Sequence, residues 1–291
     1  MAFIGDIPPG QLWIPIDDYF FNMPSALYIV CTEHGFVVAA DGRRRKGEGE
    51  NAELLNDDEI KIFKITDPGR CLAYAAVGTV GLAKRDSTDD PNVVVFLPSE
   101  IESAAIELSS KRFVEPSLYV RNLCRPVYNK ILKAKKDGLI DYPENPVTEG
   151  FDEPGMTIAR LLVFGYYEGT SVCFIIRFFH REQELGALEP YPMLLKWGDE
   201  IGHGSQKVWN CLQTDEDFRQ YRPNRPKRRE NITINQAADV ARKHILACCD
   251  PKAREIDPMV CNGIGGYVHI AEISQTGFKW IVPPTQMSAC H

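Results

Sequence analysis

The chain has 291 residues, of which 44% are hydrophobic and 25% are charged, and its formal net charge is −7. This acidic balance argues against non-specific binding to nucleic-acid backbones. No apolar run reaches the roughly 18 residues of a transmembrane helix, and no basic flank precedes an apolar stretch as in a signal peptide. The nine cysteines form no CxxC pair, so we expect reduced thiols in a cytoplasmic protein.

Strand patterns fill most of the first 80 residues. A leader rich in proline and aromatic residues, 1–24, precedes two apolar runs that a turn with Gly joins into a hairpin. Asp41 follows the second run, and the polar residues 42–59 are typical of an exposed loop. The connections are too short for crossover helices, so we expect one antiparallel sheet. Its strands are expected at 26–31, 36–40, 61–65 and 71–77.

The middle of the chain has helical periodicity. Ser99 and Glu102 fit a capping box at the start of a first helix. A second helix is expected over residues 116–136, and Pro126 in its interior should kink or split it. Residues 79–97, before the first helix, are interpreted as an inserted loop.

Strands return in the second half of the chain. They are expected at 157–164, 171–178, 193–197, 268–273 and 278–282. A Gly-rich turn at 202–205 should lead into a short helix, and the basic, Pro-rich residues 216–231 predict a surface loop. Thr233 should cap a further helix. Helices segregated from mostly antiparallel strands indicate the α+β class.

Several short stretches, taken in order, carry a resemblance to a known family. Residues 25–43 read SALYIVCTEHGFVVAADGR, and residues 61–65 read KIFKI. Gly78 closes the next apolar run, and GHGS at 202–205 and GG at 265–266 follow later. This ordered set resembles the β subunits of the proteasome, which are N-terminal-nucleophile (Ntn) hydrolases.

The resemblance covers roughly residues 25–283 and implies a single Ntn-hydrolase domain over that range. The implied fold is a four-layer α-β-β-α sandwich with two antiparallel sheets. Residues 1–24 are then a leader or propeptide, and residues 284–291 are a tail. The family's closed rings also imply a homo-oligomer or proteasome-like ring partners.

The resemblance assigns roles to particular residues. In the family, the first residue of the mature chain is the nucleophile, and its own α-amino group is the base. The register places Ser25 in that role, Lys61 as the activating amine and Asp41 as its partner. The oxyanion donor is then a backbone N–H near Gly78. The implied reaction is hydrolysis of a peptide or amide bond, and it requires the removal of residues 1–24, because the nitrogen of Ser25 is otherwise an amide.

Four positions depart from the family's pattern. Pro24 precedes Ser25, whereas active members cleave themselves after a glycine. The family's supporting serine, aspartate and second serine correspond to His203, Cys261 and Ile264. An isoleucine side chain cannot hydrogen-bond an amine, so the support of the nucleophile is lost or rebuilt. His203 either compensates as a base or is a turn histidine that only hydrogen-bonds.

Two functions remain open at this point. One is an Ntn peptidase or amidase with a peptide substrate, in which processing frees Ser25. The other is a catalytically silent structural or assembly subunit of a proteasome-like complex that retains residues 1–24. In the second reading Ser25 is a strand-entry serine, and Asp41 and Lys61 form a structural ion pair.

Other charged and polar clusters carry weaker indications. The basic stretches 43–46 and 222–229 could bind an anion or nucleic acid, but solvated loops explain them better. The six histidines have no HxxxH or HxH spacing, so we expect no metal site. No Walker loop or strand-borne GxGxxG occurs, so we expect no cofactor, and we expect no association with membranes.

Overall fold

The computed structural model describes residues 11–13, 25–46, 53–78, 81–83, 93–139, 156–180, 190–284 and 289–290. It confirms the α+β class, and the chain divides into two compact units. Unit 1 is built from the described residues of Phe63–Met193, and unit 2 from those of Ile4–Ile62 and Leu194–His291. No helix within these described stretches is long and apolar enough to cross a lipid bilayer.

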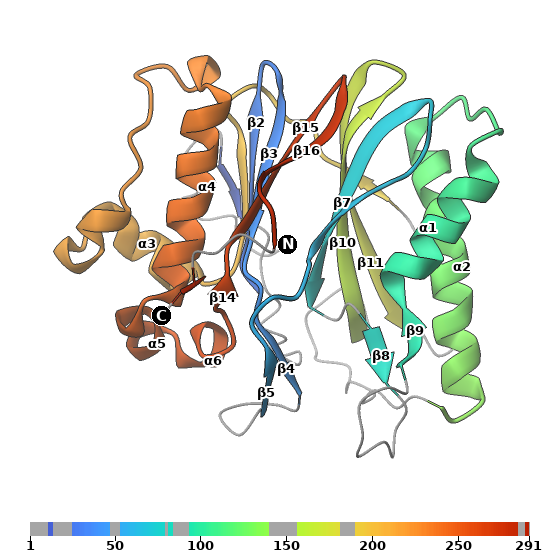
Figure 1. Cartoon of the computed structure of the whole chain (residues 1–291), viewed down its shortest axis with the longest axis horizontal. Coiled ribbons are helices and arrows are strands. Elements are labelled where there is room, and N and C mark those ends of the chain that lie inside the picture. Colours follow the sequence, from blue (N-terminus) through green and yellow to red (C-terminus); the bar gives the residue numbers. More distant parts are fainter. Residues whose placement is uncertain are drawn as a thin grey trace, which may run out of the picture. The chain divides into compact units, whose positions relative to one another are not determined.

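Among its described residues, unit 2 holds a six-stranded sheet (Figure 1). Neighbouring strands are antiparallel, except that β1, which comes from the leader, runs parallel to β13 at one edge. The expected hairpin of β2 and β3 is confirmed. The order across the sheet is β1 (Gln11–Trp13), β13 (Glu200–His203), β2 (Leu27–Thr32), β3 (Gly35–Ala40), β15 (His269–Ser274) and β16 (Gly277–Val282).

Helices cover one face of this sheet. The longest of them among the described residues of unit 2, α4 (Ile234–Cys249), packs against β2 and β3. It begins at Thr233 as predicted, because the Thr233 side chain and Gln236 form a capping box. The shorter helices of unit 2 are α3 (Gln206–Thr214), η2 (Glu216–Tyr221), η3 (Arg229–Asn231), α5 (Pro251–Ile256) and α6 (Pro258–Cys261).

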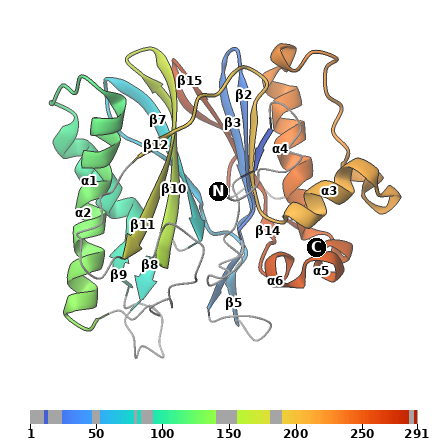
Figure 2. The same cartoon turned by 180° about the vertical axis from the view of Figure 1, so that it is seen from behind.

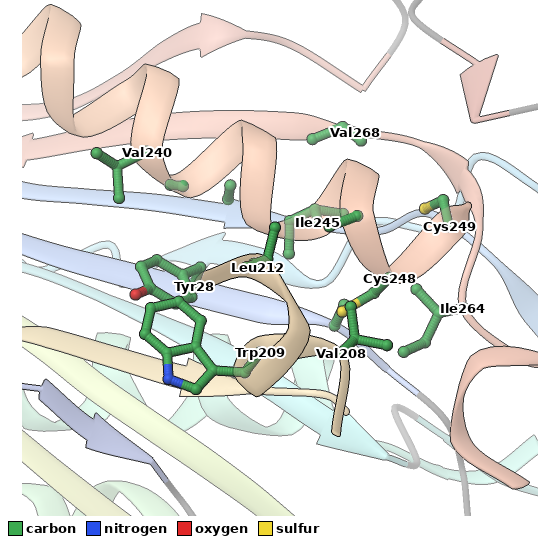
Figure 3. Packing of buried hydrophobic residues seen from close by; sticks show 14 of the residues in the cluster. Tyr28, Val208, Trp209, Leu212, Val240, Ile245, Cys248, Cys249, Ile264 and Val268 are labelled. Atoms are coloured by element: carbon green, nitrogen blue, oxygen red, sulfur yellow. The ribbon is translucent and has the colours of Figure 1, made fainter. Parts of the chain in front are cut away.

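The core of unit 2 lies between its sheet and α4. Strand alternation places Ala26, Tyr28 and Val30 on the face toward this core, where all three are almost fully buried. Figure 3 shows Tyr28 beside Trp209 of α3, with their ring centroids 5.7 Å apart. Burial of such large side chains is the main favourable contribution to the stability of the unit.

The basic segment of residues 216–231 is only partly solvated. Phe218 is fully buried, and Arg225 donates two hydrogen bonds, of 3.0 and 2.8 Å, to the carboxylate of Glu200. That carboxylate is buried on β13 and also accepts a hydrogen bond from the Tyr28 hydroxyl. Most of the segment lies at the surface, as predicted, but it contains the short helix η2 and is anchored by Phe218 and Arg225, because a buried carboxylate requires a partner of opposite charge.

The described part of unit 1 contains a five-stranded sheet. Strand β10 pairs antiparallel with β7 and β11, and β11 pairs antiparallel with β12. Two helices, α1 (Leu97–Leu108) and α2 (Pro116–Lys136), pack on each other, and α2 contacts β11 (Figure 2). The strand order is β12 (Tyr191–Pro192), β11 (Thr170–His180), β10 (Met156–Tyr167), β7 (Arg70–Gly78) and β6 (Ile62–Lys64).

An ion pair is buried in unit 1. The Arg70 guanidinium donates to Asp67, and its Cζ lies 4.4 and 4.9 Å from the ring centroids of Tyr119 and Tyr167. The Tyr119 hydroxyl donates to the same carboxylate at 3.0 Å. Charge, hydrogen bonds and cation–π contacts thus all stabilise the buried guanidinium, although its Nε has no hydrogen-bond partner among the described residues.

The four early strands do not share one sheet, so that prediction is wrong. Strands β2 and β3 belong to unit 2, whereas β6 and β7 belong to the sheet of unit 1. The reason is a long-range pairing, because β3 takes β15 from the end of the chain as its second neighbour. The expected loop 42–59 also contains a short hairpin of β4 (Arg44–Lys46) and β5 (Glu53–Asn56).

The first helix begins earlier than predicted. Helix α1 starts at Leu97, and the Ser99 hydroxyl donates to the Phe96 carbonyl instead of capping the helix. Pro98 in the first turn, whose fixed φ suits that position, accounts for the shift. Helix α2 is continuous through Pro126 and is not split. Burial of Leu123 and Val127 on either side offsets the cost of the proline, about 3 kcal/mol.

Two predicted connections are also revised. Residues 193–197 form no strand, and the strand lies instead at β13, which overlaps the first two residues of the predicted Gly-rich turn 202–205. Within 79–97, β8 (Gly81–Ala83) pairs with β9 (Val93–Phe96), while residues 79–80 and 84–92 lie outside the described residues. In the predicted tail, β17 (Ala289–Cys290) pairs with β14 (Gly266–Tyr267).

Candidate functional site

Asp41 lies directly after β3 and is completely buried in unit 2. Its carboxylate accepts backbone N–H bonds from Ala26 at 2.8 Å, Gly265 at 3.2 Å and Arg43 at 3.3 Å. These donors come from three separate segments, so the carboxylate joins the start of β2, the end of β3 and the segment before β14. Backbone donors of this kind stabilise an ionised carboxylate away from water.

Lys61 completes this arrangement. Its Nζ lies 2.7 Å from Asp41 Oδ1, and the two side chains are 4% and 0% exposed. The structure therefore brings together the two residues that the register assigned to neighbouring roles. A pair so fully removed from water carries a large desolvation cost, which the three backbone donors to Asp41 help to offset.

Ser25 lies next to this pair but is not bonded to it. The Ser25–Ala26 peptide donates its N–H to Asp41, so the serine is one residue from the carboxylate. Ser25 is 3% exposed, and its hydroxyl makes no hydrogen bond with any described residue. Gly78, the expected position of the oxyanion donor, closes β7 in unit 1, where it pairs with Ala159.

His203 is a strand residue and not the turn residue that the sequence predicts. It is the last residue of β13, pairs with Leu27 and is 5% exposed. The turn begins one residue later, at Gly204, where φ is +140°. A Cβ at Gly204 would lie 3.6 Å from that of Ala26, so this turn lies directly against the start of β2.

The other two supporting positions are apolar in character. Cys261 is fully buried, and burial together with the charge of Asp257 raises the pKa of its thiol to about 12. The thiol is therefore neutral, unlike a carboxylate. Ile264 is fully buried, near Val208 and Cys248 (Figure 3). Neither side chain supplies the charge or the hydroxyl that the family has at these positions.

His269 is a neighbour of Lys61 that the sequence analysis missed. Its Nε2 accepts the backbone N–H of Lys61 at 3.3 Å. Burial, followed by the positive charge of Lys61, lowers the pKa of His269 to about 3, so the ring is neutral. The sequence offered one indication of this site, a histidine within the apolar strand pattern of residues 268–273. Its partner could not be predicted, because it is the backbone N–H of Lys61 and no side-chain pattern identifies a backbone group.

A serine and an aspartate outside the predicted set also pair nearby. Ser205 caps α3, and its hydroxyl donates to Asp257 Oδ2 at 2.7 Å while accepting the N–H of Val208 at 3.1 Å. Lys207 lies 3.6 Å from the other carboxylate oxygen. This aspartate therefore anchors the start of a helix, which is a structural role.

Close packing of glycines fixes the segment that reaches Asp41. The Arg43 guanidinium binds Asp57 through bonds of 2.7 and 3.3 Å. A Cβ on Gly265 would lie 2.4 Å from Arg43 Cζ, and one on Gly266 would lie 2.4 Å from the Asp57 carbonyl oxygen. Glycine is required at Gly266, where φ is +73° and the contact is with backbone, whereas a side chain at Gly265 would have to displace the Arg43 guanidinium.

The arrangement can hold a buried positive charge one residue away from Ser25. Within the described ranges, no group of three histidine, cysteine or acidic side chains is placed to hold a metal ion. No family model matches the chain, and no curated protein matches it.

Proposed function

We propose that this chain is a proteasome-β-like Ntn-fold protein that serves as a catalytically silent structural or assembly subunit and retains residues 1–24. In this proposal the two units make up one domain over residues 25–283, and their sheets are the inner layers of a four-layer α-β-β-α sandwich. Partners would be further copies of the chain or proteasome-like ring subunits.

The observation that carries the proposal is the leader strand. Residues Gln11–Trp13 form β1, which pairs with β13 in the register Gln11 to Glu200 and Trp13 to Gly202. β13 in turn pairs with β2, the strand that Ser25 precedes. Residues 11–13 of the leader are thus part of the sheet, and their removal would leave β13 as an open edge with unpaired backbone groups.

The chemistry of the site supports the same conclusion. An N-terminal nucleophile needs a free amine at Ser25, whose nitrogen is in an amide bond with Pro24 in the intact chain. The positions that support the amine in the family hold a buried neutral thiol at Cys261 and a buried alkyl group at Ile264. Catalysis by such a unit requires all its members together.

The mass of the purified, intact protein tests the proposal. We expect the full-length mass, unchanged after long incubation at neutral pH. A mass that begins at Ser25 would contradict the silent assignment. Lys61→Met is the matched variant, because it keeps the length of the side chain and removes the amine. If the chain is not cleaved, this variant should also have the mass of its own full-length sequence.

A second function, an Ntn peptidase or amidase, is favoured by one specific observation. Lys61 Nζ is held 2.7 Å from Asp41, and the Ser25–Ala26 peptide binds the same carboxylate. In this alternative, cleavage frees Ser25, and its α-amino group takes the hydroxyl proton as Oγ attacks the carbonyl carbon of a peptide. The amine of the broken peptide bond leaves with that proton, and water then hydrolyses the acyl ester. Cleavage before Ser25 that Lys61→Met abolishes would establish this function in place of the first.

A further inference from the structure

Glu200 lies where the leader strand, the sheet and the basic segment meet. It is the first residue of β13 and pairs through the backbone with Gln11 of β1 on one side and Val30 of β2 on the other. Its side chain is 2% exposed and is bound by Arg225. The residue that begins the pairing with the leader strand is therefore also the residue that the basic segment holds.

The basic segment is fixed where it begins. The Arg222 guanidinium donates to the backbone carbonyl of Leu212 at 3.1 Å and to that of Asp215 at 2.9 Å. The carbonyl of Leu212 belongs to α3, and that of Asp215 follows this helix directly. Arg222 thus ties the start of the segment to the end of α3.

The segment is fixed again seven residues later. Gly198 has a φ of +84°, and a Cβ there would lie 2.5 Å from the Arg229 carbonyl carbon, so the two backbones touch. Gly198 also donates its N–H to the Cys31 carbonyl at 2.7 Å. Since Gly198 lies two residues before Glu200, this second attachment holds the segment at the start of β13.

Between these attachments the chain is stiffened by proline. Residues 222–228 belong to no helix or strand, and Pro223 and Pro226 flank Asn224 and Arg225. Proline fixes φ and reduces the conformational entropy that the segment loses when it becomes ordered. The backbone of this segment is therefore well suited to present Arg225 in one position without support from regular secondary structure.

The contact of Arg225 with Glu200 couples this segment to the sheet. Two hydrogen bonds and opposite charges join the side chains, and the Arg225 Cζ lies 5.9 Å from the ring centroid of Trp209. A buried carboxylate that loses its cation is strongly unfavourable. The start of β13 is therefore stable in its place only while the segment stays closed over it.

We propose that residues 222–229 form a latch that retains the leader strand. While Arg225 binds Glu200, β13 stays on β2 and offers its other edge to β1. When this contact opens, β13 loosens and β1 leaves the sheet. The opening is local, because β1 is an edge strand with three residue pairs and the structural units of a protein can open separately.

This inference rests on the proposed function and deepens it, since it names the contact that keeps the leader strand in place. The two can fail separately. The intact mass reports whether residues 1–24 are present, whereas hydrogen exchange of β13 reports whether the latch holds the sheet, and β13 can be followed whether or not the leader remains.

Hydrogen exchange of the full-length protein, followed by mass spectrometry at neutral pH, tests the latch. In Arg225→Met we expect the peptides that cover residues 11–13 and 200–203 to exchange about tenfold faster or more than in the parent. The peptides of α4 in unit 2 and of α2 in unit 1 should exchange at the parent rates. Arg225→Lys keeps the charge and should give a smaller increase.

Arg219→Met is the matched control. Arg219 lies on η2 in the same basic segment, but its side chain is 78% exposed and its ion pair is with Glu216, 3.7 Å away at the surface. The substitution is the same and removes the same charge, so the exchange of residues 11–13 and 200–203 should stay at the parent rate.

A double variant separates the latch from the cost of a buried charge. Arg225→Met with Glu200→Gln leaves no unpaired carboxylate, so it should fold even if Arg225→Met alone does not. We expect β1 and β13 still to exchange faster than in the parent, because the contact that joins them to the segment is missing. Thermal unfolding checks that each variant is folded.

Three outcomes would overturn the inference. Residues 11–13 and 200–203 could exchange at the parent rate in Arg225→Met. Exchange could instead rise equally in α4, which would make the contact a general stabiliser of unit 2. The double variant could also return to the parent rates, which would show that the unpaired charge alone had opened the sheet.

Discussion

Unit 1 and unit 2 each bury an ion pair, and the two pairs are built in different ways. In unit 1, Asp67 and Arg70 are three residues apart, and in unit 2, Asp41 and Lys61 are separated by 20 positions. Both aspartates are 0% exposed, and the two cations are 5% and 4% exposed. Burial alone therefore does not distinguish the candidate site from a structural pair.

The difference lies in what else satisfies each cation. The Arg70 guanidinium is stacked against Tyr119 and Tyr167 and also donates to the Lys111 carbonyl. For the Lys61 ammonium, the acceptor within the described residues is Asp41. The unit 2 pair therefore depends on a single carboxylate, whereas the cation of the unit 1 pair also contacts two aromatic rings and a backbone carbonyl.

The largest expected effect comes from removing that carboxylate. Asp41→Ala should lower the free energy of unfolding by about 3–5 kcal/mol, because it leaves a buried ammonium and three backbone N–H groups without their acceptor. Asp67→Ala should cost less, since Arg70 keeps its rings and the Lys111 carbonyl. Urea unfolding of both variants measures the difference.

Equal losses of unfolding free energy in Asp41→Ala and Asp67→Ala would contradict this difference between the two ion pairs. The double variant Asp41→Ala with Lys61→Met is the control. It should be less destabilised than Asp41→Ala alone, because no unpaired charge is then buried.

Acid should lower the free energy of unfolding of unit 2 through His269, by a smaller amount than Asp41→Ala does. His269 beside Lys61 has a pKa of about 3, below the ordinary value near 6.5, so the unfolded chain takes up the proton first. The contribution of the neutral ring to the free energy of unfolding is complete above about pH 6.5 and is lost progressively as the pH falls toward 3. The expected loss at pH 5 is about 2 kcal/mol.

His269→Gln should remove this part of the acid sensitivity, because glutamine offers an acceptor to the Lys61 N–H and does not titrate. Urea unfolding at pH 7 and pH 5 measures it. His244, whose pKa is also lowered to about 3 by burial, still titrates in that variant and provides the internal reference. An unchanged pH dependence in His269→Gln would contradict the account.

The smallest expected effect is that of Ser25→Ala. The Ser25 hydroxyl makes no hydrogen bond with a described residue, so its loss should change the free energy of unfolding by no more than about 0.5 kcal/mol. Tyr119→Phe in unit 1, which loses the 3.0 Å bond to Asp67, should cost about 1 kcal/mol. Thermal unfolding compares the two, and a larger loss for Ser25→Ala would assign the serine a structural bond.

Local patterns predicted much of the fold, and long-range pairings limited the rest. The β2–β3 hairpin and the Thr233 cap depend on neighbouring residues, and both are confirmed. The division of the early strands between two sheets depends on β15, more than 200 residues further along the chain, which no local pattern reports.

The candidate site shows the same limit. The resemblance to a family predicted that Asp41 and Lys61 lie together, because Asp41 directly follows one strand and Lys61 directly precedes another, at the positions where that family has such a pair. His269 and the Ser205–Asp257 pair could not, because their partners are a backbone group and a helix cap that exist only after folding. The anchoring of the basic segment could not be predicted for the same reason, since the pair of Arg225 with Glu200 also forms only after folding.

The discontinuity of unit 2 bears on the order of events during synthesis. Its sheet takes β2 and β3 from the first part of the chain and β13, β15 and β16 from the last, with all of unit 1 in between. A ribosome therefore completes unit 1 before the partners of the early hairpin exist. That hairpin, which is apolar on both faces, must wait with its edges exposed, so we expect refolding of unit 2 to be the slower phase and the one that chaperones shield.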